Sequence, residues 1–132
     1  MRVLVCGGRD FNNYNLLSKT LHEVIYDGDH TYYSDVTIIS GNARGADKLG
    51  EQFARDNECK LEIFPADWDK FGKAAGHIRN QQMIDEGKPD LVVAFPGGVG
   101  TKNMIERSVK AGVRTVSIHK DGKNYTELYK DG

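Results

Sequence analysis

The sequence lacks a strong excess of charge of either sign. Its 132 residues include 18 lysines and arginines and 19 aspartates and glutamates, which gives a formal net charge of -1. Non-specific binding to nucleic acid depends on a basic face that neutralises phosphates. The charge balance therefore argues against a general nucleic-acid binder, although it remains compatible with a local basic cluster.

The sequence is also poor in cysteine and has no apolar run of transmembrane length. Cys6 and Cys59 each adjoin an apolar strand-like segment, so we expect reduced thiols in or beside a core. The four histidines are far apart and no cysteine–histidine spacing suits zinc, so we expect no metal and no cofactor. Because Met1 is followed at once by a strand-like segment, we expect a cytoplasmic protein without a signal peptide or membrane contact.

Short apolar segments alternate with segments of helical periodicity along most of the chain. The predicted strands are residues 2–6, 36–39, 60–64, 91–95 and 113–118. The predicted helices are residues 14–26, ended by Asp27-Gly28-Asp29, and residues 46–57, 70–86 and 101–111. The strand–helix alternation predicts one domain over residues 1–132.

This order of elements is typical of an α/β fold with a Rossmann-like, doubly wound parallel sheet. We expect five strands in the order 3-2-1-4-5, with right-handed crossovers and helices on both faces. The strands are almost continuously apolar, as in sheets covered on both sides. The polar segment from about residue 119 is expected to form a short helix around residues 125–129 or to fray.

Glycine-rich segments follow three of the predicted strands. They are Gly7-Gly8-Arg9-Asp10, the segment from Ser40-Gly41 to Gly45-Ala46-Asp47, and Pro96-Gly97-Gly98-Val99-Gly100-Thr101. Glycine lets backbone N–H groups approach an anion, and a helix N-terminus adds its positive dipole end. Doubly wound sheets bind ligands at the carboxyl ends of their strands, at the switch point predicted between the first and fourth strands. The sequence therefore predicts a phosphate site there, although tight turns alone would explain any single cluster.

Several side chains could complete such a site. Arg9 and Arg44 lie in glycine loops, where each either pairs with a phosphate or is solvated. Arg79 and Asn80 share a helix face with Gly76, so Arg79 is predicted to point at a ligand rather than at Asp85 or Glu86.

Residues near the predicted site also have ordinary structural explanations. Trp68 follows the third strand and either packs or stacks on a base. Asp47 and Thr101 both fall in the first turn of a helix, where acidic and capping residues are common.

Five ordered motifs carry a resemblance to a known family. They are Val5-Cys6-Gly7-Gly8-Arg9-Asp10-Phe11, the segment from Ser40 to Asp47, Pro65-Ala66-Asp67-Trp68, the segment from Gly72 to Met83, and the segment from Ala94 to Thr101. Together they span residues 2 to about 118. The chain resembles the SLOG superfamily, and within it the small stand-alone YspA-like branch found in bacteria and phages.

The superfamily includes the lonely-guy phosphoribohydrolases, which release bases from nucleoside monophosphates. Their pattern has a helical arginine, then Pro-Gly-Gly-x-Gly-Thr and a glutamate three residues after the threonine. By this resemblance Arg79 matches the arginine and residues 96–101 match the phosphate loop, but Met104 stands at the glutamate position. Glu106 is about 200° round a helix from Met104, so it is no simple substitute. The resemblance also implies a homodimer.

Three functions follow from these observations. The first is a sensor or sequestering protein for a nucleotide-derived ligand, such as a nucleoside monophosphate, ADP-ribose or a relative of NAD. The second is a nucleotide N-glycosidase, with Arg79 and Glu106 as candidate catalytic residues and Asp10 or Asp47 as other possible acids. The third is a single-stranded nucleic-acid binder, by analogy with the DNA-processing protein of the same superfamily. The candidate ligand-binding residues are Gly7, Gly8, Arg9, Ser40, Gly41, Arg44, Gly45, Asp47, Trp68, Arg79, Asn80, Pro96, Gly97, Gly98, Gly100 and Thr101.

Overall fold

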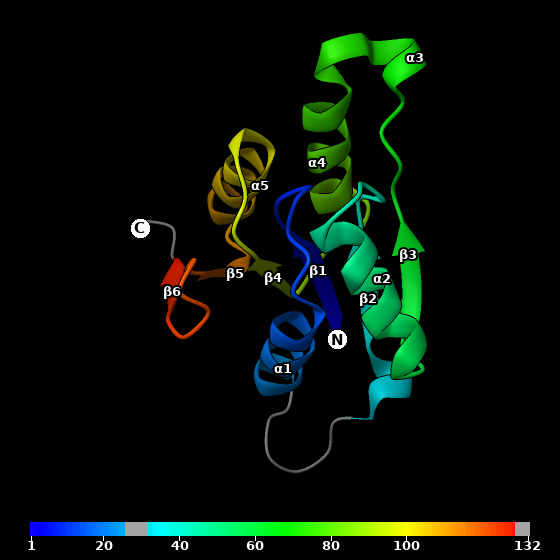
Figure 1. The fold of residues 1–132 in the computed structure, drawn as a ribbon. Coiled ribbons are helices and arrows are strands. Elements are labelled where there is room, and N and C mark those ends of the chain that lie inside the picture. Colours follow the sequence, from blue (N-terminus) through cyan, green and yellow to red (C-terminus); the bar gives the residue numbers. More distant parts are fainter. Residues whose placement is uncertain (26–31, 129–132) are drawn as a thin grey trace.

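A single twisted sheet forms the centre of the molecule (Figure 1). The computed structural model describes residues 1–25 and 32–128, and within them the sheet has six strands in the order β3-β2-β1-β4-β5-β6. The strands are β1 (Arg2–Cys6), β2 (Thr37–Ser40), β3 (Lys60–Ile63), β4 (Leu91–Ala94), β5 (Arg114–Ile118) and β6 (Tyr125–Leu128). The first five pair in parallel, which confirms the expected order, and β6 pairs antiparallel with β5.

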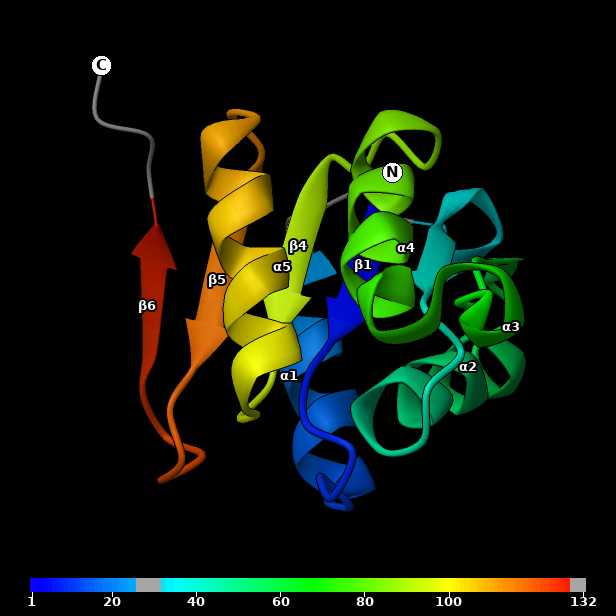
Figure 2. The same cartoon turned by 90° about the horizontal axis from the view of Figure 1, so that it is seen from above.

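Helices cover both faces of the sheet, as predicted (Figure 2). They are α1 (Tyr14–Ile25), α2 (Ala46–Asp56), α3 (Trp68–Phe71), α4 (Ala75–Asp85) and α5 (Val99–Lys110), with short 3₁₀ helices at Tyr33–Asp35 and Gly72–Ala74. The predicted end of the first helix, at residues 26–29, lies outside the described residues. None of the helices in the described part of the chain has the length and apolar character needed to cross a membrane.

Alternate residues of each central strand contribute to two separate cores. Val3 and Val5 face α1 and α2, where they join Leu17, Leu21 and Phe53 in one buried cluster. Leu4 and Cys6 of β1 face α4 and α5, where they pack with Met83 and Met104 in the second cluster. Cys6 is buried and Cys59 partly buried, both as free thiols. Burial on both faces explains why the strands are almost continuously apolar.

The predicted helix over residues 70–86 is divided into three pieces. Asp67 caps the first piece, α3, by accepting a hydrogen bond from the Lys70 backbone N–H at 3.0 Å. Gly72 then adopts a φ of +55°, which interrupts the helix before α4 begins at Ala75. This break corrects the prediction, and it sets α3 and its Trp68 apart from the sheet at the end of α4 (Figure 1).

The sixth strand is a second correction. The segment expected to be helical or frayed instead forms a hairpin, in which β6 runs beside β5. Asp121 accepts hydrogen bonds from the backbone N–H groups of Lys123 and Asn124, and Gly122 has a φ of +70°. This turn lets the chain reverse and pair with the open edge of β5. Residue 129 of the expected helix lies outside the described residues.

Candidate functional site

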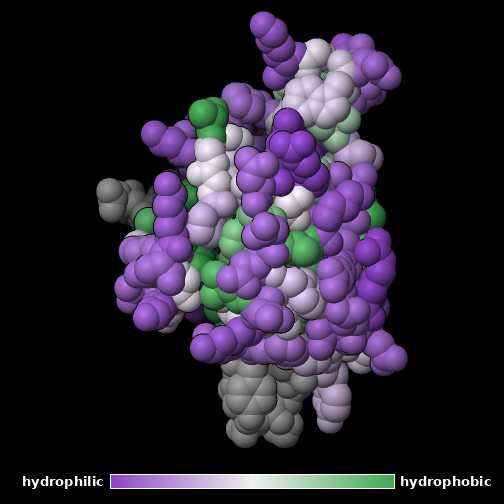
Figure 3. Space-filling model, viewed as in Figure 1, coloured by the Kyte–Doolittle hydropathy of each residue, from purple (hydrophilic) through white to green (hydrophobic). Residues whose placement is uncertain are grey.

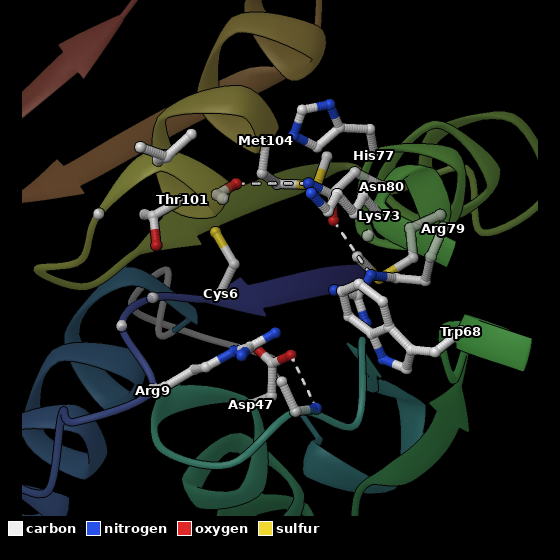
Figure 4. Close-up of a pocket in the computed structure, with 18 residues that line it drawn as sticks. Cys6, Arg9, Asp47, Trp68, Lys73, His77, Arg79, Asn80, Thr101 and Met104 are labelled. Atoms are coloured by element: carbon white, nitrogen blue, oxygen red, sulfur yellow. Dashed lines mark hydrogen bonds between the residues drawn. The ribbon is translucent and has the colours of Figure 1, made fainter. Parts of the chain in front are cut away.

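Two neighbouring hollows lie at the carboxyl ends of the strands, where β1 and β4 pair and the chain turns in opposite directions. The first hollow has a volume of about 350 Å³, within the range of roughly 300–1,000 Å³ that small-molecule sites occupy. It lies between the loop after β1, the start of α2, α4 and the start of α5 (Figure 4). The second hollow adjoins it on the side of the loop after β2.

The structure brings most of the predicted residues to these hollows. Those that line the first hollow are Gly7, Gly8, Arg9, Asp47, Trp68, Arg79, Asn80, Gly98, Gly100 and Thr101. Gly41 and Arg44 line the second hollow, together with Arg9, Trp68 and Arg79. The predicted residues that line neither hollow are Ser40, Gly45, Pro96, Gly97 and Glu106.

Some of the glycines are required by close packing of the loops. Gly8 donates a backbone hydrogen bond to the carbonyl oxygen of Pro96 at 2.9 Å, which joins the loops after β1 and β4. A Cβ on Gly97 would lie 2.6 Å from the Gly8 nitrogen, and one on Gly45 would lie 2.6 Å from the Arg9 carbonyl carbon. Gly45 also has a φ of +82°, which favours glycine. These glycines hold three loops together around the switch point.

Gly98 and Gly100 have no such packing role. A Cβ at either position would meet no protein atom within 4 Å, and neither residue has a positive φ. Both line the first hollow. The fold therefore leaves open space beside their backbone, on the side where a bound group would approach.

The N-terminus of α5 faces the same space. Lys102 donates the first helical hydrogen bond of this helix to Gly98, so the N–H groups of Val99, Gly100 and Thr101 precede that bond. No side chain in the described part of the chain caps the helix at Gly98. Unpaired N–H groups and the helix dipole make this turn suited to an anion.

Asp47 is a buried carboxylate in the wall of the first hollow. Its residue is only 6% exposed, and its Oδ2 accepts a hydrogen bond from the Ala43 backbone N–H at 3.1 Å. Burial raises the pKa of this carboxyl to about 6, although the Ala43 hydrogen bond and the charges of Arg79 and Arg9 act in the opposite direction. Asp47 therefore keeps its proton to a higher pH than an exposed aspartate does.

Arg79 extends from α4 across the site. Its guanidinium donates hydrogen bonds to the carbonyl oxygen of Gly41 and to the Oδ1 of Asn80. The side chain is thus held toward the loops rather than toward Asp85 or Glu86. Desolvation lowers the pKa of Arg79, while the charge of Asp47 raises it. Asn80 in turn donates to the carbonyl oxygen of Gly100 at 3.3 Å, which connects Arg79 to the first turn of α5.

Arg9 and Trp68 form the rim between the two hollows. The guanidinium carbon of Arg9 lies 5.7 Å from the centroid of the Trp68 ring, within the range of a cation–π contact. Trp68 is 49% exposed, so its ring remains available to another flat group. Figure 4 shows both side chains at the mouth of the site, with Arg9 extending toward Asp47.

Ser40 supports the site from beneath. It is fully buried, and its hydroxyl donates to the Oε2 of Glu51 at 2.8 Å while accepting from the Asn42 backbone N–H at 3.0 Å. Glu51 is itself only 1% exposed and also faces Lys48 and Arg55. Ser40 therefore fixes the loop after β2 rather than lining either hollow.

The other candidate acids are placed less favourably. Asp10 has a side chain that is 96% exposed, and Glu106 is exposed on α5 outside both hollows. Met104 is buried and lines the first hollow with Cys6 and Met83, which gives it a sulfur-rich floor. Of the three candidate acids, Asp47 alone places its carboxylate in the wall of the first hollow.

The sequence analysis missed two basic residues that line the first hollow. Lys73 and His77 line it beside Asn80, and all three are labelled in Figure 4. Their spacing of i, i+4 and i+7 would have placed them on one helix face. Within the described residues, no group of three or more histidine, cysteine, aspartate or glutamate side chains is arranged to hold a metal ion.

The fold and these hollows define a class of doubly wound α/β protein with a candidate anion site at its switch point. Comparison with known proteins supports this assignment. Residues 1–71 match the model of the YspA, cpYpsA-related SLOG family. The chain is also 32% identical over 124 residues to the Gene 61 protein of Mycobacterium phage D29, covering 89% of this chain and 95% of that protein. The chain belongs to the YspA, cpYpsA-related SLOG family.

Proposed function

We propose that this protein binds a nucleotide, or a nucleotide-derived molecule, with a phosphate against the backbone of Gly98, Gly100 and Thr101. Membership of the SLOG family points to nucleotide-related binding or processing. The ligand would occupy the first hollow and serve as a signal or as cargo that the protein sequesters. No step of this function needs a metal or a cofactor.

One observation carries this proposal: two glycines that line the first hollow have no packing reason to be glycine. A side chain at Gly98 or Gly100 would project into open space, whereas Gly97 between Pro96 and Gly98 is packed against Gly8. Glycine at the two open positions lets an anion reach the first-turn N–H groups of α5. Close approach of a ligand therefore explains what packing does not.

Two arginines supply the charge that a phosphate needs. Arg9 and Arg79 line the first hollow and interact with Asp47 across it. Charge-assisted hydrogen bonds from a guanidinium to a phosphate are stronger than neutral ones. The exposed ring of Trp68 offers a surface on which a base can stack.

Calorimetry with AMP, ribose 5-phosphate and adenosine tests this proposal. We expect AMP and ribose 5-phosphate to bind, because both carry the phosphate, and adenosine to bind at least tenfold more weakly. Equal binding of adenosine and AMP would contradict a phosphate site. Absence of binding by all three compounds would contradict the nucleotide site as a whole.

A second function, hydrolysis of the N-glycosidic bond, is favoured by Asp47. A carboxyl with its pKa near 6 can donate a proton to a leaving base at neutral pH. Arg79 lies close enough for its charge to influence this carboxyl. Release of free base from AMP, measured by liquid chromatography and abolished in Asp47→Asn, would make the protein an N-glycosidase.

A further inference from the structure

The second hollow is basic, and the function proposed above uses only the side chains that it shares with the first hollow. Its volume is about 560 Å³, and it opens beside the loop after β2. In the part of the chain that the structure describes, its charged lining consists of Arg9, Arg44 and Arg79, and no acidic side chain lines it. The first hollow differs, because Asp47 in its wall offsets part of the positive charge.

Two of these arginines are available to a ligand. Arg44 pairs with Asp10 at 3.3 Å, but the two side chains are 74% and 96% exposed. Such an exposed pair contributes little to stability and opens easily. Arg9 is exposed and rests on the Trp68 ring. A bound anion can therefore recruit both guanidinium groups without breaking a buried interaction.

The two hollows share part of their lining. Arg9, Ala43, Trp68 and Arg79 contribute to both. A ligand anchored at the start of α5 would extend into the second hollow past these shared side chains. The face shown in Figure 3 is largely hydrophilic, with small hydrophobic areas.

We propose that the two hollows form one site for a nucleotide that carries a second phosphate group. This inference rests on the proposed function. The first phosphate lies at Gly98–Thr101, and the second lies among Arg9, Arg44 and Arg79. Guanidinium groups suit this role because their paired N–H donors match phosphate oxygens. The base stacks on Trp68 at the junction.

Two kinds of nucleotide carry a second phosphate in different positions, and calorimetry distinguishes them. In ADP-ribose the phosphates are joined directly, whereas in adenosine 3′,5′-bisphosphate they are attached to different ribose oxygens. Calorimetry compares both compounds with AMP on the wild-type protein and on Arg44→Ala. We expect at least one two-phosphate compound to bind at least tenfold more tightly than AMP. The tighter of the two identifies the phosphate arrangement.

Arg44 makes the test specific because it lines only the second hollow. Arg44→Ala should weaken binding of the preferred two-phosphate compound about tenfold, and Arg44→Glu should weaken it further. Arg44→Ala should weaken binding of AMP much less than binding of the two-phosphate compound. Lys19→Ala removes an equal charge from an exposed position of α1 and should leave every affinity unchanged. Thermal unfolding of each variant checks that it remains folded.

Trp68 provides an independent signal because the chain contains one tryptophan. Binding of AMP or a two-phosphate compound should change its fluorescence, whereas ribose 5-phosphate, which has no base, should change it much less. Equal changes with all ligands would contradict stacking of the base on Trp68.

The outcomes separate this inference from the function on which it rests. If neither AMP nor either two-phosphate compound binds, the proposed function fails. If AMP binds but the two-phosphate compounds bind no more tightly, or Arg44→Ala weakens AMP equally, only the inference is overturned. Tighter, Arg44-dependent binding of a short single-stranded oligothymidylate would also overturn it, since the second hollow would then hold a nucleic-acid strand.

Discussion

The guanidinium of Arg79, on α4, donates a hydrogen bond to the carbonyl oxygen of Gly41, in the loop after β2. The two residues are 38 positions apart in the sequence. A Cβ on Gly41 would lie 2.7 Å from the Nη1 of Arg79 and 2.9 Å from the Oδ2 of Asp47. Gly41 thus makes room for the Arg79 guanidinium, which lines both hollows, and for the buried carboxylate of Asp47, which lines the first.

The contrast between Gly97 and Gly98 predicts opposite effects of neighbouring substitutions. Gly98→Val should leave the protein folded, because its side chain enters open space, but it should abolish stabilisation by AMP. Gly97→Ala should lower the melting temperature, because its Cβ would lie 2.6 Å from the Gly8 nitrogen. Thermal unfolding with and without AMP measures both effects. Unchanged AMP binding by Gly98→Val would remove this loop from the site.

Replacement of Arg79 tests its contact with the ligand. Arg79→Ala should weaken AMP binding by about 1.5–3 kcal/mol, the value of a hydrogen bond to a charged group. Arg79→Lys keeps the charge but loses the paired donors, so it should restore only part of the affinity. Lys110→Ala, at the far end of α5, is the matched control. Calorimetry showing equal affinities for the wild type and Arg79→Ala would contradict a direct contact.

The raised pKa of Asp47 predicts that the free energy of unfolding decreases as the pH rises. Its pKa is raised from 3.8 to about 6, so the folded protein holds this proton more tightly than the unfolded chain does. The free energy of unfolding should therefore fall between about pH 4 and pH 6 and remain lower above that range. The decrease is at most about 3 kcal/mol, from about 1.4 kcal/mol for each unit of pKa.

Asp47→Asn isolates this effect. The amide oxygen can still accept the Ala43 hydrogen bond, but the position no longer ionises. The variant should match the wild type near pH 4 and be more stable by up to about 3 kcal/mol at pH 8. Urea unfolding at several pH values measures the difference, with Asp69→Asn as a control for loss of an exposed charge. A difference that is constant with pH would contradict the raised pKa.

Met104 predicts slow or absent hydrolysis of AMP. It stands at the position that resembles the glutamate of the phosphoribohydrolases, and a thioether cannot donate a proton to a leaving base. General acid catalysis typically contributes 10²–10⁴-fold, so its absence should be plain in the rate. Chromatography of AMP incubated with pure protein measures released adenine. Turnover near about one per second, within the usual range for enzymes, would contradict this prediction and direct attention to Asp47.

A substituted Met104 gives the complementary test. Met104→Glu should raise hydrolysis above the wild type if the first turn of α5 presents this position to the ribose, since Met104 lines the first hollow. Met104→Gln has nearly the same shape but no carboxylate, so it should not raise the rate. Equal rates in the two variants would show that a carboxylate at this position does not act on the bond.

The sequence by itself determined the order of the five parallel strands and the edge of the sheet at which the candidate site lies. The reason is that both signals are local in the sequence. Strands covered on both faces are apolar along their length, and glycine-rich loops mark the ends of strands where a ligand binds. It also placed Arg79 and Asn80 on one face of a helix. It did not predict β6, although Asp121-Gly122 is a hairpin signal, because the polar segment becomes a strand only by pairing with β5.

Only the tertiary structure decided which residues of the glycine loops serve packing and which are open to a ligand. Gly97 and Gly98 are neighbours with the same chemistry, and their difference comes from Gly8, which lies some ninety positions away in the sequence. In the sequence Asp47 is an ordinary acidic residue in the first turn of a helix, whereas its raised pKa arises from its burial in the folded protein. Close contacts and desolvation depend on distant segments brought together, so local pattern does not determine them.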